Sequence, residues 1–218
     1  MKAMLLAAGR GERLRPITET CPKPLVEVKG KPLIVYHLEA LARLGVDGVV
    51  INLGWLGETI AERIGSGAEW SLDVAYSPEG DNILETGGGI QRALPLLGQE
   101  PFLVVNADVF TDMPLPSALD DNALGHLVLV PRPAYRDVGD FSVAAGRLSN
   151  DEPRPLTFSG IAVYRPELFH DCEPGRFPLA PILRDAADRG RLTAEVWSGE
   201  WHDVGTPERL ALLNRSPD

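Results

Sequence analysis

Residues 5–25 read LLAAGRGERLRPITETCPKPL. The apolar letters at the start predict a buried strand, which opens into a loop that contains Gly9 and Gly11. Because glycine has no side chain, the backbone N–H groups of such a loop can approach an anion closely. Arg13 can hold a phosphate through two donors, and Lys23 adds a compact positive charge. The stretch therefore predicts a phosphate-binding loop after the first strand.

Two common phosphate-binding motifs share part of this pattern. A Rossmann dinucleotide-binding fingerprint needs a third glycine three residues after the second, and position 14 is leucine. The loop also spans about 15 residues from Gly9 to Lys23, whereas the Rossmann turn leads directly into a helix. A P-loop requires the letters GK followed by serine or threonine, which the loop lacks. A nicotinamide-dependent oxidoreductase is therefore disfavoured.

The composition indicates one globular domain over residues 1–218. Hydrophobic residues make up 44% of the chain and charged residues 24%, and the formal net charge is -10. A chain this acidic would repel nucleic acid, although a few cations gathered in one cleft could still bind a phosphorylated small molecule. We find neither a signal-like leader nor an apolar run long enough to span a membrane, so we expect a cytoplasmic protein.

The first half of the chain alternates apolar runs with segments of helical periodicity. This alternation predicts an α/β fold with a parallel sheet and right-handed crossovers. The expected strands are 3–8, 48–53, 72–76 and 102–107, and the expected helices are 32–45, 57–65 and 87–98. The second half predicts strands at 126–131 and 156–164, a hairpin over 141–149 that turns at Gly146-Arg147, helices at 179–190 and 206–214, and a strand at 193–197.

Two aspartates are candidates for metal ligands. The motif VVNADVF at 104–110 delivers Asn106 and Asp108 to the carboxyl edge of the sheet, where open α/β folds bind ligands. Asp108 is a hard oxygen ligand of the kind that Mg²⁺ prefers, although an aspartate after a strand more commonly closes a turn. Asp203, in WHDVGTPERL at 201–210, has the same two interpretations.

A glycine-rich segment, SPEGDNILETGGGIQRAL at 77–94, is a candidate for contact with a nucleobase. Its three consecutive glycines open a predicted helix, whose exposed N–H groups could hold a polar edge. Glu79 accepts hydrogen bonds only, so it could take N3–H of uracil or N1–H and the amino group of guanine. This chemistry leaves the choice of base open.

The whole string G-x-G-x-R-x-x-P-x-T…P-K-P, from Gly9 to Pro24, resembles the sugar nucleotidyltransferase family. The resemblance implies a three-layer Rossmann-like nucleotidyltransferase fold with a mainly parallel mixed sheet. In that fold, residues 1–110 mainly bind the nucleotide, while 111–218 mainly bind the sugar and supply a second metal carboxylate. The reaction would join a nucleoside triphosphate to a sugar 1-phosphate with release of pyrophosphate, and a phosphate nucleophile needs no general base.

The resemblance also implies roles for particular residues. Arg13 and Lys23 would be catalytic, and Asp108 and Asp203 would bind Mg²⁺. The nucleotide would contact Ala8, Gly9, Gly11, Glu12, Arg13, Lys23, Glu79, Thr86, Gly87 and Gly88. The sugar would contact Asn106, Asp140 and Gly160.

The phrases INLGWLGETI and LETGGGI are similar to a compact subgroup that transfers a uridylyl group from UTP to N-acetylmuramic acid 1-phosphate in cell-wall recycling. Mannose-1-phosphate guanylyltransferases, or other hexose-1-phosphate nucleotidyltransferases, are the alternative. Guanylyltransferases usually carry Gly-Thr-Ala-Gly where this chain has Glu85-Thr86-Gly87-Gly88. A catalytically silent sugar-nucleotide sensor is the alternative from another class. We expect a monomer or a small homo-oligomer.

Overall fold

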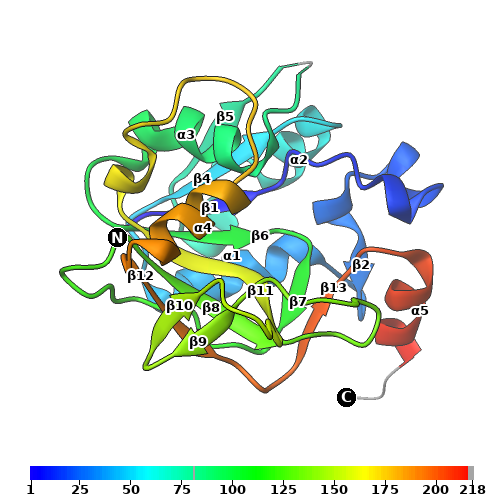
Figure 1. Cartoon of the computed structure of the whole chain (residues 1–218). Helices are drawn as coiled ribbons and strands as arrows, with labels where there is room; N and C mark the ends of the chain where they lie inside the picture. Colours follow the sequence, from blue (N-terminus) through cyan, green and yellow to red (C-terminus); the bar gives the residue numbers. More distant parts are fainter. Residues whose placement is uncertain (81, 216–218) are drawn as a thin grey trace.

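The computed structural model of this chain describes residues 1–80 and 82–215, and a mixed nine-stranded sheet forms its centre (Figure 1). The strand order is β5-β4-β1-β6-β11-β8-β12-β10-β9, and two small ribbons, β13-β7 and β2-β3, lie apart from it. The strands are β1 Ala3–Leu6, β2 Glu27–Val28, β3 Lys31–Pro32, β4 Val49–Leu53, β5 Val74–Pro78, β6 Phe102–Asn106, β7 Val109–Thr111, β8 Gly125–Pro131, β9 Ser142–Ala144, β10 Arg147–Ser149, β11 Leu156–Tyr164, β12 Leu192–Val196 and β13 Trp201–Asp203.

The α-helices are α1 Leu33–Leu44, α2 Gly57–Ile64, α3 Glu85–Leu97, α4 Ala180–Asp188 and α5 Pro207–Arg215. Short 3-10 turns are η1 Glu12–Leu14, η2 Ile17–Glu19, η3 Lys23–Leu25, η4 Ala68–Trp70 and η5 Pro166–Phe169. Each predicted helix is therefore present, with ends shifted by one or two residues. None of the helices in the described part of the chain is long and apolar enough to cross a membrane.

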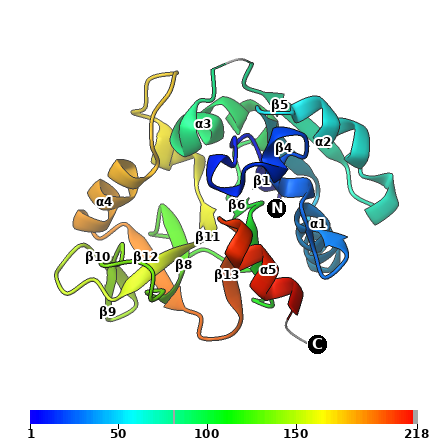
Figure 2. The same cartoon turned by 90° about the vertical axis from the view of Figure 1, so that its right-hand side faces the viewer.

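The first half forms the parallel part of the sheet, as the alternating pattern predicts. β1 pairs in parallel with both β4 and β6, and β4 pairs in parallel with β5. Ala3 and Leu5 of β1 are buried in one core with residues of α1 and α2, whereas Met4 is buried in the other with residues of α3 and α4. Successive side chains of a strand point to opposite faces, so β1 presents apolar residues to both faces of the sheet, and helices cover both sides (Figures 1 and 2).

The second half extends the same sheet with mostly antiparallel pairs of strands. β11 pairs antiparallel with both β6 and β8, and β12 pairs in parallel with β8. The predicted mixed sheet is therefore confirmed. The predicted hairpin is present as β9 and β10, but the position of its turn was wrong by one residue. Ala145 and Gly146 both have positive φ and form the turn, as a two-residue hairpin turn with the right twist requires.

The ribbon β13-β7 joins the end of the chain to the centre of the sheet. Asp203 lies opposite Val109 in this antiparallel pair, and the N–H of Val204 donates to the carbonyl of Asp108 at 2.9 Å. Helix α5 follows directly and lies beside β13 in both views (Figures 1 and 2). The two aspartates predicted as metal ligands are therefore neighbours through the backbone, although they are far apart in the sequence.

Candidate functional site

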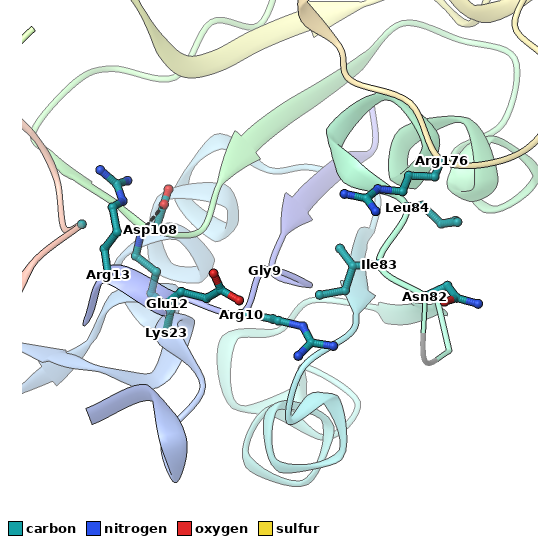
Figure 3. Close-up of a pocket in the computed structure, with 12 residues that line it drawn as sticks. Gly9, Arg10, Glu12, Arg13, Lys23, Asn82, Ile83, Leu84, Asp108 and Arg176 are labelled. Atoms are coloured by element: carbon teal, nitrogen blue, oxygen red, sulfur yellow. Dashed lines mark hydrogen bonds and ion pairs between the residues drawn. The ribbon is translucent and has the colours of Figure 1, made fainter. Parts of the chain in front are cut away.

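A cleft of about 900 Å³ opens where β1 and β6 end (Figure 3). Its walls come from the loop after β1, from the segment before α3 and from three single positions further along the chain. The lining residues are Gly9, Arg10, Gly11, Glu12, Arg13, Lys23, Asn82, Ile83, Leu84, Asp108, Arg176 and Gly205. The predicted phosphate-binding loop therefore forms one wall of the largest of the cavities described, at the carboxyl edge of the parallel strands.

The loop after β1 folds back on itself around Gly11. This residue has φ +62, and a Cβ there would lie 2.9 Å from Cγ2 of Thr18 and 3.2 Å from Cβ of Lys23. Thr18 is buried, its hydroxyl donates to the carbonyl of Gly11 at 2.9 Å, and its own carbonyl accepts from the indole N–H of Trp55 at 2.9 Å. Only glycine fits at position 11, and the resulting compact turn places Lys23 at the cleft.

The cleft gathers cations although the chain as a whole is acidic. Arg10, Arg13, Lys23 and Arg176 line it, against the carboxylates Glu12 and Asp108. In Figure 3, Arg13, Lys23 and Asp108 lie on one side and Arg176 lies on the opposite side. The cleft therefore has a local excess of positive charge, which can attract an anion although the net charge of the chain is -10.

Lys23 and Asp108 form an ion pair at the base of the cleft. Nζ of Lys23 lies 2.5 Å from Oδ2 of Asp108, and their side chains are 11% and 35% exposed. The stem of the lysine is packed away, so its charged end has a fixed position. A phosphate that enters the cleft would meet this ammonium group and the carboxylate beside it.

Asp203 has different surroundings from Asp108. Its Oδ1 accepts from Nη1 of Arg209 at 2.6 Å and from the hydroxyl of Tyr135, and Arg209 stacks over the Tyr135 ring at 3.5 Å. Burial, and then the hydrogen bond to Asp203, raise the pKa of Tyr135 to about 12, so that the hydroxyl remains a donor at neutral pH. Asp203 is not among the residues that line the cleft, whereas Asp108 is.

The donor set fits a magnesium ion that is completed by substrate. Mg²⁺ takes one or two carboxylates, with water and phosphate oxygens in its other positions. Asp108 offers such a carboxylate in the cleft. Asp203 lies on the paired strand, opposite Val109, the residue that follows Asp108. No group of three or more acidic, histidine or cysteine side chains suited to a metal occurs among residues 1–80 and 82–215. With two carboxylates, such an ion would have water or phosphate oxygens in its remaining positions.

A second pocket of about 190 Å³ adjoins the cleft and shares Gly9, Lys23, Ile83 and Asp108 with it. Ala8, Glu79, Thr86 and Asn106 also line this pocket, as do Leu6, Ala7, Pro24, Asn52 and Glu85. Glu79 is buried, with Oε1 accepting from the Asn52 amide and Oε2 from the N–H of Leu84, both at 2.7 Å. Its carboxylate therefore fixes the segment before α3 as well as facing the pocket.

The glycines at the start of α3 pack against another segment of the chain. Helix α3 begins at Glu85, and Gly87 and Gly88 lie beneath the loop that precedes α4. The N–H of Gly88 donates to the carbonyl of Phe177 at 3.1 Å, and a Cβ on Gly87 would lie 2.5 Å from the Phe177 ring. The loop before α4 therefore covers Gly87 and Gly88, and the expected contact of their backbone with a nucleotide stays a prediction. Within α3, Glu85 and Thr86 line the pocket.

A third pocket of about 420 Å³ continues from the second and shares Glu85, Thr86 and Asn106 with it. Its other lining residues are Arg136, Asp140, Phe141, Phe158, Pro178, Leu179, Ala180, Leu183 and Arg184. The predicted sugar contacts Asn106 and Asp140 therefore lie in one cavity. Gly160 packs against the side chain of Asn106. Its φ is +85, and a Cβ there would lie 2.6 Å from Nδ2 of Asn106.

Several lining residues escaped the sequence analysis. Arg176 belongs to a loop without a motif and reaches the site through an ion pair with Glu85 at 2.9 Å. Asn52 is the last residue but one of β4; it accepts from the N–H of Ala7 and donates to Glu79. A polar residue within an otherwise apolar strand was the signal for Asn52, and Arg176 offered none.

Comparison with known proteins gives consistent results. The nucleotidyl transferase family matches residues 2–127. The N-acetylmuramate alpha-1-phosphate uridylyltransferase of Neisseria meningitidis serogroup B is 47% identical, over 96% of this chain and 95% of that protein. The mannose-1-phosphate guanylyltransferase catalytic subunit beta of Danio rerio is 32% identical, over 95% of this chain and 62% of that protein.

A solved structure shows the same fold. It is a Bacillus anthracis protein proposed to be a glucose-1-phosphate thymidylyltransferase, in complex with sucrose. The TM-score is 0.84 at 21% identity, with coverage of 98% of this chain and 94% of that chain.

Proposed function

Because this chain belongs to the nucleotidyl transferase family, we propose that it transfers the uridylyl group of UTP to N-acetylmuramic acid α-1-phosphate and releases pyrophosphate. The observation that carries this choice of substrates is the similarity to the Neisseria uridylyltransferase, which extends over nearly the whole of both proteins. The similarity to the guanylyltransferase is weaker and leaves more than a third of that protein unmatched. GTP with mannose 1-phosphate is accordingly the alternative pair.

The cavities support a division of the substrates along the site. The cleft between the loop after β1 and Arg176 would hold the phosphates of UTP, because its wall combines backbone N–H groups with four cations. The second pocket, with Glu79 and Asn52, would take the nucleoside. The third pocket, beyond Asn106, would take the sugar. The reacting phosphates then meet near Lys23 and Asp108, which border both the cleft and the second pocket.

In the proposed reaction an oxygen of the sugar 1-phosphate attacks the α-phosphorus of UTP. A new P–O bond forms, the bond from the α-phosphorus to the β-phosphate oxygen breaks, and pyrophosphate leaves with the electron pair. The attacking phosphate is already ionised at neutral pH, so no side chain has to remove a proton. Arg13 and Lys23 would align the phosphates and offset the charge on the departing oxygen.

We propose Mg²⁺ as the cofactor, with Asp108 and Asp203 as the residues that would hold it. When bound, the ion supplies positive charge that stabilises the leaving pyrophosphate. Asp203 would then exchange its bond with Arg209 for the metal, whereas Asp108 already faces the cleft. We place the reaction in the cytoplasm, where nucleoside triphosphates are supplied, and in the recycling of cell-wall sugars.

The experiment incubates the protein with UTP, N-acetylmuramic acid α-1-phosphate and MgCl₂. Pyrophosphate is measured by a coupled assay, and the nucleotide sugar is identified by mass spectrometry. We expect equal amounts of pyrophosphate and UDP-N-acetylmuramic acid, and no product after removal of divalent cations with EDTA. Product from GTP and mannose 1-phosphate alone would replace the proposed substrates. Folded protein without product from any pair would favour the silent sensor.

A further inference from the structure

The third pocket has an arginine that the proposed reaction does not use. Arg184 lies on α4, with Leu183 and Leu179 beside it in the pocket wall. Its guanidinium lies over the ring of Phe141, at 5.3 Å from the centroid, and Nη1 donates to Oδ1 of Asn150 at 3.2 Å. Asn150 in turn donates to the carbonyl of Arg184 at 2.9 Å. These contacts fix the position of the cation in the pocket wall, beside the apolar side chains of α4 and Phe141.

The second arginine of the pocket is already neutralised. Nη1 of Arg136 donates to both carboxylate oxygens of Asp140, at 3.2 and 3.0 Å. Asp140 is held further by the N–H of Phe158, which donates to Oδ2 at 3.0 Å. Within the described residues, by contrast, Arg184 has ring and amide contacts and forms no ion pair with a carboxylate. Glu85, the other carboxylate of the pocket wall, is paired with Arg176 at 2.9 Å, so Arg184 is the charged lining residue that has no ion-pair partner in the described part of the chain.

The proposed substrate has an anionic group beyond its phosphate. N-acetylmuramic acid is N-acetylglucosamine with a lactyl ether at C3, which ends in a carboxylate. The third pocket joins the second through Glu85, Thr86 and Asn106, so a sugar whose phosphate lies near Asp108 extends toward α4. Arginine presents a planar pair of donors that matches a carboxylate, and burial beside apolar side chains strengthens such a pair.

We propose that Arg184 binds the lactyl carboxylate of the sugar and thereby selects N-acetylmuramic acid over N-acetylglucosamine. The inference rests on the proposed function, because it assigns a part of the same substrate. Phe141 and Asn150 hold the guanidinium in place before the sugar enters, so little side-chain freedom is lost on binding. Arg184 is then a specificity-determining residue, and the chemistry at the phosphates does not depend on it.

The test compares two product ligands that differ only in the lactyl group, UDP-N-acetylmuramic acid and UDP-N-acetylglucosamine. Isothermal titration calorimetry measures both dissociation constants, so the test does not depend on turnover. We expect the protein to bind the lactyl-bearing ligand about 10- to 100-fold more tightly, the range for a charge-assisted contact. Arg184→Gln should remove most of this preference, and Arg184→Lys should restore part of it.

Two further variants separate the roles of the neighbouring arginines. Arg189→Gln removes the same charge from the end of α4, where Arg189 is exposed and paired with Asp185, and should keep the preference. Arg136→Gln breaks the pair with Asp140 and should weaken both ligands to a similar extent. Loss of the preference in Arg136→Gln with retention in Arg184→Gln would overturn the assignment.

The outcomes also separate this inference from the proposed function. If the unmodified protein converts N-acetylmuramic acid α-1-phosphate but binds both products equally, the role of Arg184 is wrong and the function stands. If the protein binds neither uridine nucleotide, both fail. Equal weakening of the two ligands in Arg184→Gln, with a lowered Tm, would indicate a packing role and would also refute the inference.

Discussion

Gly89 of α3 leaves room for a buried hydrogen bond beside the second pocket. Alanine in place of glycine ordinarily stabilises a helix, but at this position it should destabilise the protein. A Cβ at this position would lie 2.6 Å from Oε1 of Glu79 and 3.0 Å from Nδ2 of Asn52. These two atoms are joined by a hydrogen bond of 2.7 Å, and both side chains are buried. The added methyl group would therefore displace a fixed polar pair that has no room to move.

The magnitude follows from three contributions. Alanine in place of glycine within a helix stabilises a protein by about 1 kcal/mol. Overpacking a filled site costs about 1–3 kcal/mol. The disturbed bond from Asn52 to the Glu79 carboxylate costs about 1.5–3 kcal/mol, because one partner is charged. We therefore expect Gly89→Ala to lower the free energy of unfolding by about 2 kcal/mol or more.

Urea unfolding at pH 7.5 measures this change, and a double-mutant cycle with Glu79→Ala identifies its cause. Removal of the Glu79 side chain makes space for the methyl group, so Gly89→Ala should cost less in that background or become stabilising. The KM for UTP should rise in Gly89→Ala, since Glu79 and Asn52 both line the second pocket. A variant more stable than the unmodified protein, with unchanged KM, would refute this reasoning.

Three further changes test other parts of the structure. Burial lowers the pKa of His37 to about 4, from 6.5, so the unfolded chain binds more protons than the folded protein below pH 6.5. Between pH 7.5 and pH 5, the free energy of unfolding should therefore fall by about 2 kcal/mol more in the unmodified protein than in His37→Asn. Equal losses for the two proteins in urea titrations would contradict the burial of His37. Asp108→Asn should lower kcat at least about 100-fold at saturating Mg²⁺, and a rate within a few-fold of the original would exclude Asp108 as the metal ligand. Gly160→Ala forces alanine to φ +85 against Asn106, so it should destabilise the protein by about 1–2 kcal/mol in chemical denaturation and raise the KM for the sugar phosphate, and an unchanged KM would separate Asn106 from the sugar.

The sequence predicted the parts of this protein that depend on local pattern. The run at 102–107 is apolar at every position up to Asn106, because both faces of β6 are buried, and it was found correctly for that reason. The loop after β1 was also identified, since its glycines and cations follow directly from the strand. The helix end at Gly45 has the positive φ and the backbone bonds expected of a C-cap.

The parts that escaped prediction depend on contacts between distant segments. The loop that carries Arg176 and Phe177 covers the start of α3, and no local pattern indicates where a loop of this kind will settle. Asp203 likewise accepts a hydrogen bond from Tyr135, which lies in a distant part of the sequence. Motif spacing predicted which residues belong to the candidate site, whereas their partners and their access to the cleft required the folded structure.

The ratio of two specificity constants tests the proposed function. One is kcat/KM for the sugar phosphate with N-acetylmuramic acid α-1-phosphate and saturating UTP, and the other is the same quantity with mannose 1-phosphate and saturating GTP, both with Mg²⁺. We expect a ratio of at least about 100 in favour of the first pair, with UDP-N-acetylmuramic acid as the product. A ratio of one or less would contradict it and identify a different sugar nucleotide as the product.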